Sequence, residues 1–240
     1  MLPPHEEVPG FAALGFTAFT TTRQAGSFNL ASEEPAAAIF GRWMGLVESL
    51  APIAERLATA RQVHGDRILE HDGSWSGWLR DTSGADGHLT RVTGTAMAVT
   101  LADCVPVFLA HPSGLGAVLH SGWKGTAAGI IGRALDAIVS MGLDVRETRV
   151  HLGPSICGRC YEVSPDVYLA VTGERVSRPA PVDLRAVIAT RARQAGAAVT
   201  ISDWCTRCHN ERFFSHRAGD NGRQLGVLVV SGRRALTSEL

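Results

Sequence analysis

The sequence predicts an α+β fold in which layered mixed β-sheets are flanked by helices. Several apolar runs have the length of buried strands, and amphipathic segments with helical periodicity lie between them. Strands and helices do not alternate strictly, which argues against a doubly wound parallel sheet. The chain has 240 residues and no linker or charge run divides it, so we expect one domain over residues 1–240.

The first half of the chain predicts strands around one helix. Ser, two Glu and Pro at residues 32–35 are typical of a helix start, and this helix should end near Leu50. Residues 71–85 hold two tryptophans among Gly, Ser and Asp, so we interpret them as a surface loop whose tryptophans serve packing. The expected strands of this half are residues 11–22, 57–63, 96–101 and 105–110.

The second half predicts a strand over residues 115–120 and then a helix over residues 124–141, which Gly142 ends. His120 therefore lies at a strand end just before a helix. The other expected helices are residues 165–171 and 182–195, and the other expected strands are residues 148–152, 199–202 and 224–230.

The composition favours a small-molecule substrate over nucleic acid or membrane partners. Lys plus Arg and Asp plus Glu both number 23, and the arginines are scattered, which is atypical of a nucleic-acid binder. The N-terminus has no basic region or apolar run, and no apolar stretch is long enough to span a membrane. Five cysteines, four of them in two Cys-x-x-Cys pairs, suit thiols kept reduced. We expect a cytoplasmic protein.

Two histidines and one cysteine occur where predicted strands run out into loops: His64, Cys104 and His120. One thiolate and two imidazoles leave the fourth tetrahedral position of zinc open, as in catalytic sites. Separations of 40 and 16 residues mean that tertiary structure must assemble such a site. Asp103, next to Cys104, is a candidate general base or a partner that fixes an imidazole tautomer, and it is equally a candidate turn residue.

The phrases around these residues resemble the YfiH family, also called the polyphenol oxidase or laccase-domain family. The resemblance covers nearly the whole chain, with its motifs in the family's order. Among the motifs that carry it are Thr21-Thr22-Arg23, Gln62-Val63-His64-Gly65, Gly84-Ala85-Asp86-Gly87, Leu101-Ala102-Asp103-Cys104, His120-Ser121-Gly122-Trp123 and Arg212-Phe213-Phe214-Ser215-His216-Arg217.

The resemblance implies a zinc site, with copper as the other possible metal, and maps the family's ligands onto His64, Cys104 and His120. It implies layered mixed sheets with helices, a fold shared with a cytotoxic-necrotizing-factor-like cysteine hydrolase. The family's activity implies purine nucleosides and phosphate as small-molecule partners, through phosphorolysis of adenosine, inosine and methylthioadenosine and deamination of adenosine.

Phosphorolysis requires an anion site, and four cations stand in motif loops: Arg23, Lys124, Arg217 and Arg223. We take these, with Gln62, as candidate substrate- and phosphate-binding residues, against the alternative that each is solvated surface charge. The family prefers Arg where this chain has Lys124, and lysine lacks the planar two-pronged donor geometry of arginine.

The two Cys-x-x-Cys pairs are a candidate second metal site. Cys157, Cys160, Cys205 and Cys208 would together supply a structural Cys₄ zinc site, although the 44 intervening residues exceed the usual zinc-ribbon gap of about 15–20. The alternative is that each pair is only a turn in a reducing cell.

Three other functions stay open at this point. Cys104 activated by His64 or His120 would be the nucleophile of a hydrolase that edits a peptidoglycan precursor by amide cleavage. Two histidines and a cysteine also suit a copper-dependent, laccase-like polyphenol oxidase. The third alternative is a non-enzymatic interaction module stabilised by zinc.

Overall fold

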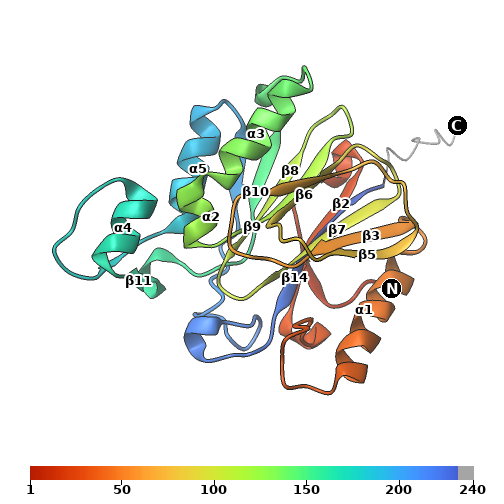
Figure 1. Cartoon of the computed structure of the whole chain (residues 1–240), viewed down its shortest axis with the longest axis horizontal. Coiled ribbons are helices and arrows are strands. Elements are labelled where there is room, and N and C mark those ends of the chain that lie inside the picture. The colour runs from red at the N-terminus through yellow and green to blue at the C-terminus, as the bar shows by residue number, and fades with distance from the viewer. Residues whose placement is uncertain (232–240) are drawn as a thin grey trace, which may run out of the picture.

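The computed structural model describes residues 1–231, and Figure 1 shows their helices and strands in four layers. Two six-stranded mixed sheets pack face to face, helix α1 covers the outside of one, and helices α2, α3 and α5 cover the outside of the other. The predicted fold of layered mixed sheets flanked by helices is therefore confirmed. The predicted domain includes residues 232–240, which lie outside the described part.

The first sheet has the strand order β1-β2-β14-β7-β3-β5. The pairs from β1 to β7 are antiparallel, whereas β3 runs parallel to both β7 and β5. Its strands are β1 (His5–Glu7), β2 (Phe16–Thr21), β3 (Arg56–Ala60), β5 (Gly77–Asp81), β7 (Thr95–Leu101) and β14 (Gln224–Val230).

The second sheet has the order β13-β10-β8-β9-β6-β4. Its central pairs are antiparallel, and its two outermost pairs, β10 with β13 and β4 with β6, are parallel. Its strands are β4 (Ile68–His71), β6 (Gly87–Thr90), β8 (Val105–Ala110), β9 (Gly116–Ser121), β10 (Arg149–Leu152) and β13 (Ala198–Ile201).

The helices complete the outer layers. They are α1 (Ala36–Leu50), α2 (Trp123–Ala128), α3 (Ile130–Ser140), α4 (Pro165–Thr172) and α5 (Leu184–Gln194). Helix α4 and strand β11 (Glu162–Val163) lie at the left of Figure 1, and β11 pairs with β12 (Ala180–Pro181). Short 3₁₀ turns occupy Ala12–Leu14, Arg23–Ala25, Val145–Glu147, Gly158–Cys160 and His216–Ala218.

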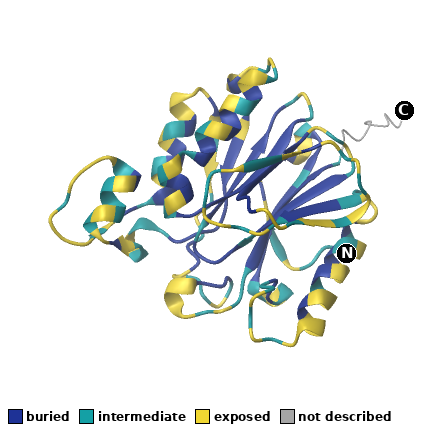
Figure 2. Cartoon of the chain, in the orientation of Figure 1, coloured by how far each residue is buried: buried dark blue, intermediate teal, exposed yellow. Residues whose placement is uncertain are grey.

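The central strands are apolar throughout because both of their faces are buried, as the dark blue strands of Figure 2 show. Successive side chains of a strand point to opposite faces, so each strand feeds two cores. In β7, Ala96 and Ala98 pack toward α1, whereas Met97 and Val99 pack between the sheets. Phe108 of β8 is fully buried in the same inter-sheet core.

Strands β7 and β8 follow each other in sequence but belong to different sheets. The bend at residues 102–104 carries the chain from one sheet to the other, and Asp103 there has φ +79°, in the left-handed region that few non-glycine residues adopt. Figure 1 shows this crossing near the centre of the molecule. The candidate ligand Cys104 therefore lies at the junction of the two sheets.

Two predictions of secondary structure were wrong. Residues 71–85 are not only loop, because Gly77–Asp81 forms the edge strand β5 along β3. An edge strand is half exposed and lacks the apolar run that marks a central strand, so its sequence resembles a loop. The single helix over residues 124–141 is divided at Gly129, whose φ of +82° ends α2 and begins α3.

Truncation of the aromatic side chain at the centre of the inter-sheet core tests this packing. We expect Phe108→Ala to lower the free energy of unfolding by about 3–5 kcal/mol, because the cavity lies where both sheets already fill the space. Urea unfolding followed by circular dichroism measures the change. The control Val139→Ala removes an exposed side chain of α3 and should change stability by less than about 0.5 kcal/mol; equal effects of the two variants would contradict this account.

Candidate metal centre

Three separate elements bring the predicted ligands together. His64 follows β3, Cys104 ends the bend between β7 and β8, and His120 lies in β9. Their ligand atoms all lie within 4.8 Å of one another. His64 has φ +60°, and it shares this left-handed conformation with Asp103 alone among the described non-glycine residues. Strained backbone of this kind is typical of functional sites, where the surrounding structure enforces it.

The fully buried carboxylate of Asp86 holds two of the ligands in place. Its oxygens accept hydrogen bonds from the backbone N–H groups of Val63, His64 and Gly65, at 3.1, 2.9 and 2.7 Å. Oδ1 also lies 2.8 Å from Nδ1 of His120. Since Nδ1–H donates to the carboxylate, Nε2 of His120 is left as the free ligand atom, which is the arrangement that orients metal-binding histidines.

Of the roles predicted for Asp103, its contacts are those of a turn residue. Its Oδ1 accepts a hydrogen bond from the Thr206 hydroxyl at 2.6 Å, and its Oδ2 accepts one from the backbone N–H of Arg217 at 2.7 Å. These bonds fix the strained bend to two loops from the end of the chain. The carboxylate that fixes an imidazole tautomer is thus Asp86, not Asp103.

The three candidate ligands shift one another's pKa values strongly. Burial alone would raise the pKa of Cys104, but the charge of His120 and hydrogen bonds with both histidines outweigh it and lower the pKa to about 6. Burial likewise disfavours the charged form of His120, yet Cys104 and Asp86 raise the pKa of His120 to about 9. The site therefore favours a thiolate, which is the form that binds metals.

The donor set fits a zinc ion with one open position. Sulfur and imidazole nitrogen are ordinary zinc ligands, and three protein ligands are the number found in catalytic sites. Gly122 allows the close packing that the centre needs: a Cβ atom there would lie 2.9 Å from Sγ of Cys104 and 3.3 Å from Cδ2 of His64. A larger residue at this position would displace a ligand.

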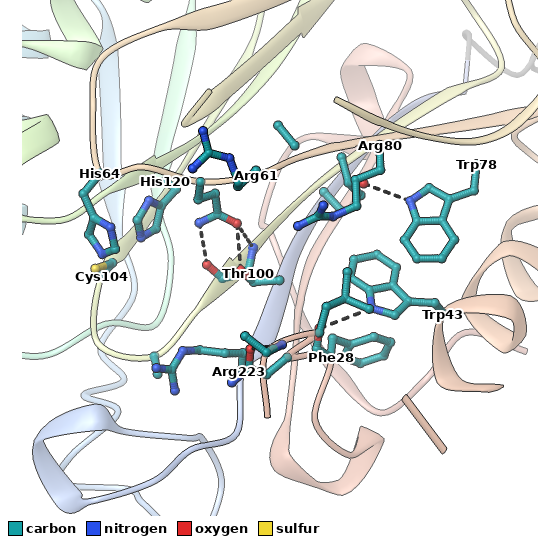
Figure 3. A pocket seen from close by; sticks show the side chains of 18 of the residues that line it. Phe28, Trp43, Arg61, His64, Trp78, Arg80, Thr100, Cys104, His120 and Arg223 are labelled. Atoms are coloured by element: carbon teal, nitrogen blue, oxygen red, sulfur yellow. Dashed lines mark hydrogen bonds between the residues drawn. The ribbon is translucent and has the colours of Figure 1, made fainter. Parts of the chain in front are cut away.

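A cavity of about 990 Å³ opens beside the three ligands, and its side chains are drawn in Figure 3. Its walls come from α1, β3, β5 and β7, and from the loop after β2. At the end away from the ligands, the indole rings of Trp43 and Trp78 stack with centroids 4.8 Å apart and an angle of 15° between them. Arg61, Arg80 and Arg223 also line the cavity, and no carboxylate does so among the described residues.

The predicted substrate residues divide between the cavity and other places. Arg223 lines the cavity, and so does Gln62, whose side chain bonds in both directions to Thr100 of β7. Arg23, Lys124 and Arg217 are not among the lining residues. Arg23 pairs with Asp220 at 2.6 Å, Lys124 is exposed beside the Trp123 ring, and Arg217 lies over the ring of Tyr161 and donates to the carbonyl of Glu162.

Sequence reasoning missed several residues of this region. Asp86 stands in the phrase Gly84-Ala85-Asp86-Gly87 but had no partner until the fold placed it between His64 and His120. Trp78, which we interpreted as packing, lines the cavity. It lies on β5, in the segment that the sequence predicts as a loop. Arg61 directly precedes the Gln62-Val63-His64-Gly65 motif, and Arg80 lies outside every motif. Their place at the cavity depends on the parallel pairing of β3 with β5, which the sequence does not reveal.

Comparison with known proteins finds a family model that covers most of the chain. Residues 18–231 match the family described as multi-copper polyphenol oxidoreductase laccase. The chain belongs to this family. The resemblance to the laccase-domain, or YfiH, family expected from the motifs is confirmed.

Two relatives of this chain carry the names of purine nucleoside enzymes. A purine nucleoside phosphorylase of Mycobacterium bovis is 36% identical over 217 residues, which cover 82% of this chain and 85% of that protein. An adenosine deaminase, RL5, from an unknown prokaryotic organism is 31% identical over 181 residues, covering 67% of this chain and 69% of that protein.

Two solved structures share the fold. YfiH from Bacillus licheniformis superimposes with a TM-score of 0.84 at 24% identity, covering 95% of this chain and 96% of that one. YlmD from Geobacillus stearothermophilus gives a TM-score of 0.80 at 27% identity, covering 95% of this chain and 94% of that one.

Within residues 1–231, none of the helices combines the length and apolar character needed to cross a membrane.

The role of Asp86 in the metal centre can be measured directly. We expect Asp86→Asn to weaken zinc binding by about 10–100-fold, because the amide no longer accepts from both His120 and the His64 loop. Competition with a chromophoric chelator gives the affinity. The control Asp66→Asn alters a partly exposed carboxylate that pairs with Arg133, and it should bind zinc like the wild type. Unchanged affinity in Asp86→Asn would show that the ligands need no such clamp.

Proposed function

We propose that this protein is a zinc-dependent enzyme of purine nucleosides, which phosphorolyses adenosine, inosine and methylthioadenosine and deaminates adenosine. The observation that carries the proposal is the single cavity that joins the His64, Cys104 and His120 ligands to the stacked tryptophans. The names of the relatives support the substrate class, since they act as purine nucleoside phosphorylases and as an adenosine deaminase.

The aromatic end of the cavity suits a purine base. Trp78 is partly exposed, and its Nε1–H donates to the Thr59 hydroxyl at 2.9 Å, which fixes the indole plane. Trp43 backs this ring and is itself fixed by a hydrogen bond from Nε1–H to the Phe28 carbonyl at 3.2 Å. A rigid aromatic surface of this kind gains about 1–3 kcal/mol by stacking on a nucleobase.

The cations of the cavity suit phosphate. Arg61, Arg80 and Arg223 line the cavity, and no carboxylate is among its described lining residues, so no acidic side chain of the cavity neutralises them. Arginine binds phosphate through paired N–H donors. We infer that these three residues, rather than Arg23, Lys124 and Arg217, supply most of the attraction for the anion.

Both reactions replace one bond at the substrate. In phosphorolysis the ribose C1′–N9 bond breaks, a phosphate oxygen bonds to C1′, and the base takes up a proton. In deamination a water oxygen bonds to C6 of the purine and the amino group leaves as ammonia. When bound, zinc supplies Lewis acidity at this position of the cavity. The chain contributes the fixed orientation of His120 through Asp86, and His216, which also lines the cavity, is a candidate proton carrier.

One observation favours a second candidate function. Cys104, His120 and Asp86 form a thiol, imidazole and carboxylate series, in which the pKa of the thiol is lowered and that of the imidazole raised. Such a series is the arrangement of cysteine hydrolases. Without metal, this chain would therefore carry the groups for amide cleavage. A zinc ion bound to Sγ of Cys104 would block that function, because the same sulfur cannot be ligand and nucleophile at once.

A chromatographic assay tests the main proposal. We expect adenosine and inosine to yield free bases only when phosphate is present. Without phosphate, we expect adenosine to yield inosine. Both activities should fall at least about 100-fold after zinc is removed, and return when zinc is restored, because both reactions would use the Lewis acid that the three ligands hold. The variant Cys104→Ser is the matched control for loss of the centre. If the zinc-loaded protein converts no nucleoside with or without phosphate, the proposal is wrong.

The aromatic surface gives a sharper test of the substrate. We expect Trp78→Ala to raise KM for adenosine by about 5–100-fold, with a smaller change in kcat, because stacking acts on the bound base. The control Trp75→Ala alters the same segment at a residue that packs on His71 and is not among the cavity's lining residues. Equal KM values for Trp78→Ala and the wild type would place the base elsewhere.

A further inference from the structure

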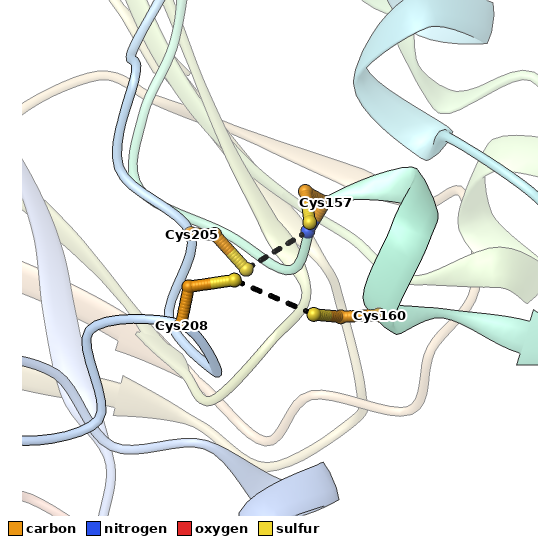
Figure 4. A group of neighbouring side chains, drawn as sticks. All are labelled: Cys157, Cys160, Cys205 and Cys208. Atoms are coloured by element: carbon orange, nitrogen blue, oxygen red, sulfur yellow. Dashed lines mark hydrogen bonds between the residues drawn. The ribbon is translucent and has the colours of Figure 1, made fainter.

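A second group of metal-binding side chains lies outside the cavity. Figure 4 shows the four cysteines of the two Cys-x-x-Cys pairs facing one another from two segments of the chain. Their sulfur atoms all lie within 4.8 Å of one another. Sγ of Cys160 lies 3.5 Å from Sγ of Cys208, and the backbone N–H of Cys157 donates to Sγ of Cys205 at 3.3 Å.

The pairing of the two segments explains why a gap of 44 residues does not keep the pairs apart. Ser155 and Cys205 form a parallel β-bridge. The backbone N–H of Ser155 donates to the Trp204 carbonyl at 3.4 Å, and that of Thr206 donates to the Ser155 carbonyl at 3.2 Å. Cys205 stands at this bridge and Cys157 lies two residues beyond it on the other segment, so the pairing of the two segments brings the four sulfur atoms together.

We propose that Cys157, Cys160, Cys205 and Cys208 bind one zinc ion in a closed structural site, separate from the candidate catalytic centre. Tetrahedral zinc with thiolates at about 2.3 Å needs sulfur atoms roughly 3.8 Å apart, and the observed spacing is close to this. Four protein ligands leave no position for substrate, which is the mark of a structural site.

The surroundings supply hydrogen-bond donors and positive charge to the cluster. The backbone N–H of Cys157 donates to Sγ of Cys205. Four thiolates with one zinc ion carry a net charge of about −2, and Arg159 and Arg207 stand inside the two loops. Arg207 donates to the Cys160 carbonyl at 3.4 Å, so one guanidinium lies against the other loop.

A disulfide does not account for the arrangement. The sulfur atoms of Cys160 and Cys208 lie 3.5 Å apart, well beyond a bond of about 2.05 Å. A redox-active Cys-x-x-Cys motif also needs only its own two thiols, whereas here all four converge.

The first cysteine turn packs closely against the start of α5. Only glycine fits at position 158, because a Cβ atom there would lie 2.9 Å from Cβ of Asp183.

The site would also support the bend that carries Cys104. Thr206, inside the second cysteine pair, donates its hydroxyl hydrogen to Oδ1 of Asp103, and the backbone N–H of Ile156, next to Cys157, donates to the Asp103 carbonyl at 3.0 Å. Both loops that the zinc would join thus hold the residue before Cys104. We infer that this ion stabilises the strained bend through these two loops, whose four cysteines are not among the residues that line the cavity.

The test counts metal and does not depend on the proposed activity. Native mass spectrometry of the full chain, purified under reducing conditions with zinc, should give two zinc ions per wild-type chain. Cys208→Ser should retain one ion, and so should the matched control Cys104→Ser, which removes a ligand of the other centre. The variant with both substitutions should retain none. One ion in the wild type that Cys104→Ser removes and Cys208→Ser leaves would overturn the proposal.

Cobalt replaces zinc as a spectroscopic probe that needs no change in the cysteine cluster. Cobalt-loaded Cys104→Ser should show the intense visible absorption of a tetrahedral ion with four thiolates, and chelation should lower its unfolding temperature, because that ion binds only the folded chain. A weak octahedral spectrum, or a disulfide between these cysteines in place of metal, would overturn the proposal even if Cys208→Ser failed to fold.

Discussion

The candidate site depends on the four hydrogen bonds accepted by the buried carboxylate of Asp86. Three come from consecutive backbone N–H groups of the His64 loop and one from the ring of His120, so one side chain joins the end of β3 in the first sheet to β9 in the second. A buried carboxylate is costly unless its oxygens are paired, and here the pairing is complete. The same bonds hold His64 in a left-handed conformation that it would otherwise leave.

The layered sheets explain why the ligands meet where they do. The chain passes from the first sheet to the second at the bend before Cys104, and the inter-sheet core around Phe108 holds the two sheets together beneath this bend. Loops at such a junction lack the regular backbone pairing of strands, so side chains there are free to serve chemistry. The cysteine cluster lies next to the same bend, because Thr206 and Ile156, which neighbour its cysteines, both donate hydrogen bonds to Asp103.

Much of the fold could be predicted from the sequence, because central strands buried on both faces give long apolar runs and helices give a clear periodicity. The edge strand β5 and the break at Gly129 could not: an exposed strand has loop-like composition, and one glycine within a helical pattern has the same appearance whether it bends the helix or not. Because β5 was not predicted, one wall of the cavity was not predicted either: Trp78 and Arg80 lie there through the pairing of β5 with β3.

The sequence by itself determined the donor types at the candidate centre, since thiol and imidazole groups in family motifs identify His64, Cys104 and His120 without any coordinates. Only the tertiary structure decided which carboxylate supports them, because Asp86 and Asp103 stand in equally suggestive phrases and differ only in what they contact. It also decided that the two cysteine pairs converge and that Arg223 lines the cavity while Arg217 does not. These relations depend on strand pairing between distant segments, and local sequence patterns do not carry such long-range contacts.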